Sequence, residues 1–152
     1  MQTKLNLIAA AIRARTRAVA PYSGFKVGAA LLTADGEIIA GANVESASYG
    51  LTCCAERVAL FSALTRNQRT FVAIAVVARI PLGPTPCGAC RQLLAEYAPD
   101  AVIWVADSSR PGQVRTFSVQ QLLPHAFKGV PRRGPLRRSR TERPPPASAH
   151  RP

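Results

Sequence analysis

Apolar residues come in blocks along the first 127 residues, and polar turns separate these blocks. Leu5, Ile8, Ile12 and Val19 lie on roughly one side of a helix that Pro21 ends. This first block therefore predicts an amphipathic helix, and its four basic residues in the first 17 do not make it a targeting peptide, because the apolar stretch is too short.

The later blocks alternate between strand-like and helix-like patterns. Two apolar runs around Ala34-Asp35-Gly36 predict a hairpin, and Ser118 is the expected N-cap of a last short helix. The expected strands are 27–33, 37–42, 71–78, 101–106 and 113–117, and the expected later helices are 54–64, 88–97 and 119–123. Buried strands that alternate with helices predict an α/β fold, in which a mixed sheet of about five strands has helices on both faces.

Composition and charge divide the chain into two parts. Of its 152 residues, 47% are hydrophobic, and the formal net charge is +12. Residues 1–127 form the expected folded domain, whereas 128–152 hold eight basic residues, one acidic residue and many prolines. This tail is expected to be disordered and solvated. Weak nucleic-acid contact is the alternative reading of the tail, and its lack of aromatic side chains disfavours it. No apolar run approaches the 18 residues of a membrane span.

The candidate chemistry lies in two cysteine segments, 52–57 and 86–91. Cys87 and Cys90 open one expected helix, and Cys54 opens another, where the helix dipole favours thiolates. Three thiolates on one ion make a zinc site with a fourth position open, and Glu56 is placed to move protons beside it. Thiols used in this way imply a reducing, cytoplasmic location.

Two other readings of the cysteines remain open at this point. Cys53 offers a fourth thiol, which would close the site and make the zinc purely structural. Alternatively, Cys87 and Cys90 form a redox pair without a metal. The closed site leaves Glu56 without a role, and the redox pair leaves Cys54 without one, which makes the hydrolytic reading the preferred one.

These segments resemble the small zinc-dependent cytidine deaminases. The resemblance runs from about residue 5 to residue 127, and Cys-Ala-Glu followed by Pro-Cys-x-x-Cys is the zinc deaminase signature. The other matching segments are Ala20-Pro-Tyr-Ser-Gly-Phe-Lys-Val-Gly-Ala-Ala30, Asn43-Val-Glu45, Ser48-Tyr-Gly50, Pro86-Cys-Gly-Ala-Cys-Arg-Gln-Leu-Leu-Ala-Glu-Tyr97 and Leu122-Leu-Pro-His-Ala-Phe127. The resemblance implies a cytidine deaminase-like three-layer α/β/α fold and a homotetramer with one zinc ion per subunit.

The resemblance also implies roles for single residues. Cys54, Cys87 and Cys90 match the zinc ligands, and Glu56 matches the proton shuttle for attack of zinc-bound hydroxide at C4 of the base. The matching substrate-binding residues are Phe25, Asn43 and Glu45 at the nucleoside, Ala55 at the base through its N–H, and Tyr49 and Phe127 toward a neighbouring subunit.

Two arginines are candidates for a further role at the zinc, and one residue departs from the family pattern. Arg57, and less directly Arg91, are candidates to tune the zinc by offsetting the charge of the thiolates. Ser46 stands where the family commonly has Asn after Asn-x-Glu, so ribose affinity is expected to differ.

The implied function is hydrolytic deamination of cytidine and 2′-deoxycytidine in pyrimidine salvage. Three alternatives are weaker: the same chemistry on a modified aminonucleoside of the blasticidin type, deamination of a polynucleotide, and a non-enzymatic zinc-stabilised protein that binds nucleic acid through the basic tail. Asn43 and Glu45, as matches to ribose-binding residues, argue against the first of these. A compact nucleoside pocket argues against the second, because a flipped base needs an open groove.

Overall fold

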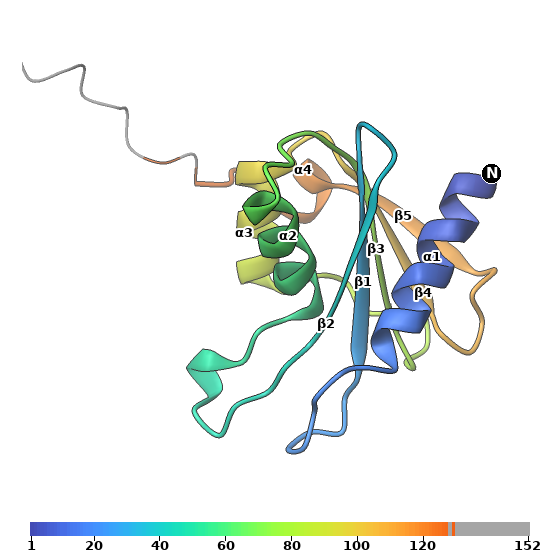
Figure 1. The fold of residues 1–152 in the computed structure, drawn as a ribbon, viewed down its shortest axis with the longest axis vertical. Coiled ribbons are helices and arrows are strands. Elements are labelled where there is room, and N and C mark those ends of the chain that lie inside the picture. Colours follow the sequence, from blue (N-terminus) through green and yellow to red (C-terminus); the bar gives the residue numbers. More distant parts are fainter. Residues whose placement is uncertain (128, 130–152) are drawn as a thin grey trace, which may run out of the picture.

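The computed structural model describes residues 1–127 and 129. The predicted basic tail, residues 128–152, lies outside the described residues apart from Gly129. A single five-stranded sheet lies between helices on both faces (Figure 1). The elements are α1 Gln2–Arg15, β1 Val27–Thr33, β2 Ile38–Ala42, η1 Tyr49–Leu51, α2 Ala55–Thr65, β3 Phe71–Ala78, α3 Gly88–Tyr97, β4 Val102–Asp107, β5 Val114–Ser118 and α4 Val119–Leu122. None of the helices in this part of the chain is long and apolar enough to span a bilayer.

The sheet is mixed, as predicted. Its strand order is β2-β1-β3-β4-β5, and only the β3–β4 pair is parallel. The α3 helix makes the crossover between these two parallel strands, which is the usual connection for such a pair. The predicted α/β/α class and the five strands are therefore confirmed.

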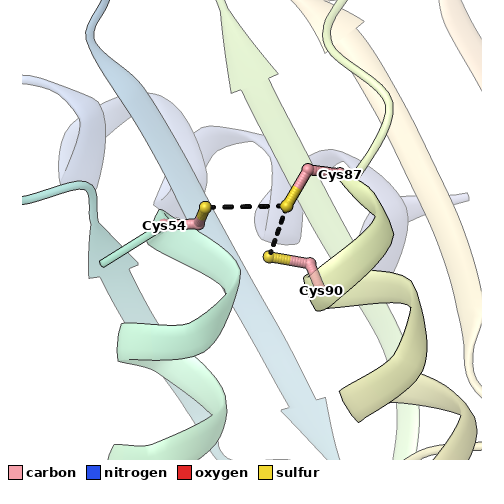
Figure 2. Close-up of side chains that lie close together, drawn as sticks. All are labelled: Cys54, Cys87 and Cys90. Atoms are coloured by element: carbon pink, nitrogen blue, oxygen red, sulfur yellow. Dashed lines mark hydrogen bonds between the residues drawn. The ribbon is translucent and has the colours of Figure 1, made fainter. Parts of the chain in front are cut away.

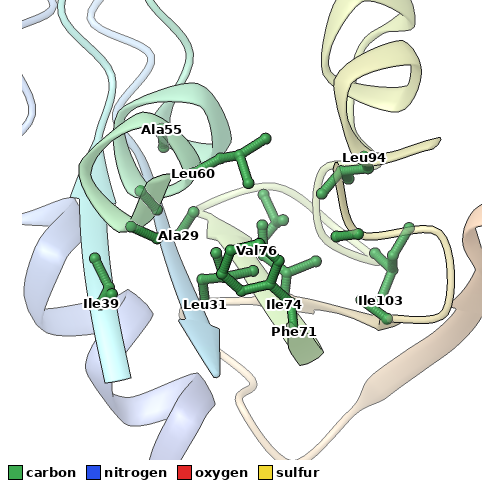
Figure 3. Packing of buried hydrophobic residues seen from close by; sticks show 14 of the residues in the cluster. Ala29, Leu31, Ile39, Ala55, Leu60, Phe71, Ile74, Val76, Leu94 and Ile103 are labelled. Atoms are coloured by element: carbon green, nitrogen blue, oxygen red, sulfur yellow. The ribbon is translucent and has the colours of Figure 1, made fainter. Parts of the chain in front are cut away.

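Two separate apolar clusters fill the two faces of the sheet. Alternate residues of β1 point in opposite directions, so that Ala29 and Leu31 pack toward α2 and α3 while Ala30 and Leu32 pack toward α1. Figure 3 shows the first cluster, in which Leu60 and Leu94 cover the central strand residues from the helix side. These two layers fix the N-termini of α2 and α3 relative to the sheet.

The face predicted for the first helix is partly wrong. Ile8 is buried, but Leu5 is 47% exposed and Val19 lies beyond the end of α1. The helix instead buries Leu7, Ile8, Ala10, Ala11 and Ala14. The prediction relied on the large aliphatic residues. The buried face consists mainly of alanines, whose small side chains allow α1 to approach the sheet closely.

This close approach depends on Gly28. A Cβ atom at position 28 would lie 2.0 Å from the Ala11 carbonyl oxygen and 2.5 Å from the Arg15 backbone nitrogen. We expect Gly28→Ala to lower the free energy of unfolding by about 1–3 kcal/mol, because α1 must move away from β1. Urea denaturation measures this. Gly112→Ala is the matched control, since no atom lies within 4 Å of its added Cβ. Equal midpoints for the two variants would contradict the expectation.

Candidate metal centre and nucleoside site

Three cysteine sulfurs converge at the N-termini of α2 and α3. Cys54 and Cys87 are the N-cap residues of these helices, and Cys90 lies in the first turn of α3. The Cys54 and Cys87 sulfurs are 3.8 Å apart, and those of Cys87 and Cys90 are 3.6 Å apart (Figure 2). The two packed helices thus bring together thiols that are 33 residues apart in sequence.

This geometry fits a tetrahedral metal ion. Zinc binds thiolate sulfur at about 2.3 Å, so tetrahedral angles would place two such sulfurs about 3.8 Å apart. The three ligand atoms all lie within 4.8 Å of one another, and Cys53 does not belong to this group. A closed four-cysteine site is therefore not what the described residues form, and a zinc ion on these three sulfurs keeps one position open.

The thiols differ strongly in their acidity. The interaction of Cys54 with the Cys90 thiol, together with the Arg57 guanidinium, lowers the pKa of Cys54 to about 5, although partial burial opposes this. The same interaction with Cys54, followed by burial, raises the pKa of Cys90.

Arg57 contacts one of the sulfurs directly. Its Nη2 donates to the Thr52 carbonyl oxygen at 2.6 Å and to the Cys54 sulfur at 3.6 Å. The guanidinium is one helical turn from Cys54, so α2 itself holds it there. This placement fits the predicted charge-tuning role.

Arg91, the second tuning candidate, hydrogen-bonds to two backbone carbonyl oxygens. Its Nε donates to the Pro86 carbonyl oxygen at 2.7 Å and its Nη1 to the Leu122 carbonyl oxygen at 2.9 Å. Its bonds thus brace the loop before Cys87 and the end of α4. These hydrogen bonds could not be predicted from sequence spacing, because Leu122 is 31 residues away from Arg91.

Glu56 is buried beside the metal centre. Only 6% of the residue is exposed, and it lies in the first turn of α2, two residues after Cys54. Burial raises the pKa of its carboxyl group to about 7. A carboxyl group that exchanges its proton near neutral pH is suited to general acid and base chemistry.

The predicted nucleoside residues 25, 43 and 45 form one hydrogen-bonded group. Asn43 donates from Nδ2 to the Phe25 carbonyl oxygen at 2.9 Å and accepts at Oδ1 from the Val27 N–H at 2.8 Å. Glu45 accepts at Oε2 from the N–H groups of Tyr22 and Ser23, at 3.0 and 3.1 Å. Both side chains therefore hold the segment that carries Phe25.

Main-chain pairing connects this group to the metal ligands. Val44, between Asn43 and Glu45, exchanges two backbone hydrogen bonds of 2.9 Å with Cys53, the residue before Cys54. On its other side, Val44 bridges Val19 in parallel. Three loop segments thus form a short ribbon beside the sheet.

The other predicted site residues, Ala55, Tyr49 and Phe127, do not belong to the hydrogen-bonded group of residues 25, 43 and 45. Ala55 is fully buried as the first residue of α2, whereas Tyr49 and Phe127 are 80% and 67% exposed. Ser46 accepts from the Ser48 N–H, and its own N–H donates to the Thr52 hydroxyl at 3.1 Å. The shorter Ser46 side chain therefore still closes its loop.

Comparison with known proteins agrees with this geometry. Residues 1–106 match the family described as the cytidine and deoxycytidylate deaminase zinc-binding region. The chain is 52% identical to a cytidine deaminase of Halalkalibacterium halodurans over 80% of this chain and 91% of that protein. It is 34% identical to a blasticidin-S deaminase of Bacillus cereus over 64% of this chain and 74% of that protein. A crystal structure of cytidine deaminase from Burkholderia pseudomallei superposes with a TM-score of 0.76 at 52% identity, over 80% of this chain and 97% of that one.

Proposed function

The chain belongs to the zinc-dependent cytidine deaminase family, and on that premise we propose that it hydrolyses cytidine and 2′-deoxycytidine to uridine and 2′-deoxyuridine, with release of ammonia. The observation that carries this proposal is the three-sulfur centre of Cys54, Cys87 and Cys90 with buried Glu56 beside it. The residues of this chain fit each part of that reaction.

Cys54, Cys87 and Cys90 would hold the ion. When bound, zinc supplies a Lewis acid that makes water acidic enough to act as a nucleophile at neutral pH. Glu56 accepts a proton from that water and delivers it to N3 of the cytosine ring. The oxygen of that water adds to C4. Glu56 then moves the hydroxyl proton of the adduct to the C4 amino group, which leaves as ammonia, and C4 keeps the oxygen as a carbonyl. A group with a pKa of about 7 can make both transfers near neutral pH.

Phe25, Asn43, Glu45 and Ala55 orient the nucleoside in this proposal. The Asn43 and Glu45 side chains bind ribose hydroxyls, Phe25 packs against the substrate, and the Ala55 N–H contacts the base. The Val44–Cys53 pairing supports this assignment, because it sets the ribose end at a fixed distance from the metal ligands. A ribose-binding pair favours a nucleoside over a blasticidin-type substrate, as does the higher identity to cytidine deaminases.

The test is a spectrophotometric assay of the purified, zinc-loaded chain. We expect the ultraviolet absorbance of free cytidine and of 2′-deoxycytidine to fall as each is deaminated. Blasticidin S and a single-stranded oligonucleotide that contains cytosine serve as the alternative substrates. Turnover of either alternative without turnover of cytidine, in protein that holds one zinc ion per chain, would contradict the proposal.

The proposal extends to a homotetramer. Tyr49 and Phe127 are matched to residues that reach a neighbouring subunit, and both are highly exposed, as is Leu51 at 74%. Tyr49 and Leu51, both in η1, give an exposed apolar surface of the kind that subunit contacts cover. The proposal also places the reaction in pyrimidine salvage in the cytoplasm, in keeping with four cysteines that are all free thiols.

Arg57 provides a test of how the chain tunes its metal. We expect Arg57→Gln to lower kcat/KM for cytidine, or the affinity for zinc, by about 10–100-fold, because the Cys54 sulfur loses its cationic partner. Kinetics and metal analysis measure the two effects. Arg66→Gln is the matched control, since Arg66 pairs with Glu37 on the surface. Kinetics and zinc content equal to those of the control would refute the tuning role.

A further inference from the structure

Three different donors hold the Glu45 carboxylate. Oε2 accepts from the N–H groups of Tyr22 and Ser23, and Oε1 accepts from the Ser23 hydroxyl. A carboxylate has about four acceptor sites, so at least one remains for a ligand hydroxyl. The direction of that free site is fixed by the three donors already in place.

Ser23 is the residue that connects this carboxylate to Phe25. Its hydroxyl donates to Glu45, and its oxygen accepts from the Phe25 N–H at 2.9 Å. The carbonyl oxygen of Phe25 in turn accepts from Asn43 at 2.9 Å. The Ser23 hydroxyl therefore connects the Glu45 side chain to the Phe25 backbone, and Asn43 holds the same backbone segment independently.

We propose that Ser23 is a positioning residue for ribose recognition, and that it acts by fixing the Glu45 carboxylate against the backbone of residues 22 and 23. The proposal rests on the proposed function, because it takes Glu45 as a ribose ligand. Ser23 itself does not need to touch the substrate. Without the Ser23 hydroxyl, the Glu45 carboxylate is held through Oε2 alone and can rotate away from the arrangement that a ribose hydroxyl requires.

A comparison of two substrates tests this role. We expect Ser23→Ala to raise KM for cytidine about tenfold with kcat little changed. With 2′,3′-dideoxycytidine, which lacks both ribose hydroxyls, the same variant should lose no more than about twofold in kcat/KM, because the Glu45 contact is then absent in both enzymes. Ser23→Thr retains a hydroxyl and should restore most of the affinity.

Ser109→Ala is the matched control for this experiment. The Ser109 hydroxyl donates to the Asp107 carboxylate at 2.8 Å in the turn after β4, so it makes the same kind of bond outside the site. Equal losses on both substrates would show a general structural role for Ser23 and would overturn the proposal. An unchanged KM for cytidine in Ser23→Ala would overturn it as well.

Failure of the proposed function would be recognised separately. In that case the unmodified chain would turn over neither substrate. Calorimetric titration with uridine and with 2′,3′-dideoxyuridine then compares Ser23→Ala with the unmodified chain. A weaker affinity of the variant for uridine alone supports the role of Ser23. Equal affinities, or no binding of either nucleoside by the unmodified chain, would overturn it.

Discussion

Glu56→Gln is expected to reduce kcat for cytidine by roughly 10²–10⁴-fold, the usual contribution of a general acid and base. The amide has nearly the size of the carboxyl group, so the buried site should keep its packing. It cannot accept a proton from water or carry one to N3 of the ring. Steady-state kinetics on zinc-loaded protein measure the loss.

Metal analysis and a matched variant make this result specific. Glu56→Gln should retain one zinc ion per chain, because Glu56 is not one of the three grouped ligands. Glu96→Gln is the control, since Glu96 lies exposed on α3 and bonds only to Gln92 among the described residues. A Glu56→Gln enzyme with near-normal kcat would remove Glu56 from the mechanism.

Removal of zinc is expected to abolish turnover and to lower the melting temperature by at least about 10 °C. A ligand at 1,000 times its Kd stabilises a protein by about 4 kcal/mol, and each kcal/mol shifts Tm by a few degrees in a domain of this size. Here the ion would link the N-termini of α2 and α3, whose sulfurs converge. Thermal unfolding before and after chelation, and after zinc is restored, measures the shift.

Two cysteine variants identify the ligands behind this effect. Cys90→Ala should reproduce the loss of zinc, of activity and of stability, because Cys90 is buried within the group. Cys53→Ala should keep all three properties, since Cys53 lies outside it. Loss of zinc in both variants would instead indicate a closed four-cysteine site without room for a water molecule.

The strands and helices were predictable because local pattern and packing agree. The apolar run 71–78 and the helix 88–97 have the predicted bounds, and the Ser118 cap of α4 forms with Gln121 as its partner. The predicted strand 101–106 and the observed Val102–Asp107 differ by one residue at each end, where the pattern of buried residues is least distinct.

The supporting contacts of the site were not predictable in this way. Ser23 and Arg91 act through hydrogen bonds to residues 22 and 31 positions away, and no periodic pattern reports such pairs. The identities of Cys54 and Glu56 could be predicted because their spacing on one helix turn is local. The candidate nucleoside residues Phe25, Asn43 and Glu45 could be predicted only from the resemblance to a known family.

The ribbon around Val44 has a consequence for how this enzyme could be redesigned. Successive side chains of an extended segment point to opposite sides, so Asn43 and Glu45 share a side only while Val44 stays paired with Val19 and Cys53. One inserted or deleted residue between 43 and 45 would turn one of the two side chains away. On the proposed ribose-binding role of Asn43 and Glu45, new substrates are therefore to be sought by exchanging side chains at constant loop length, because a change in loop length would remove one of the two contacts.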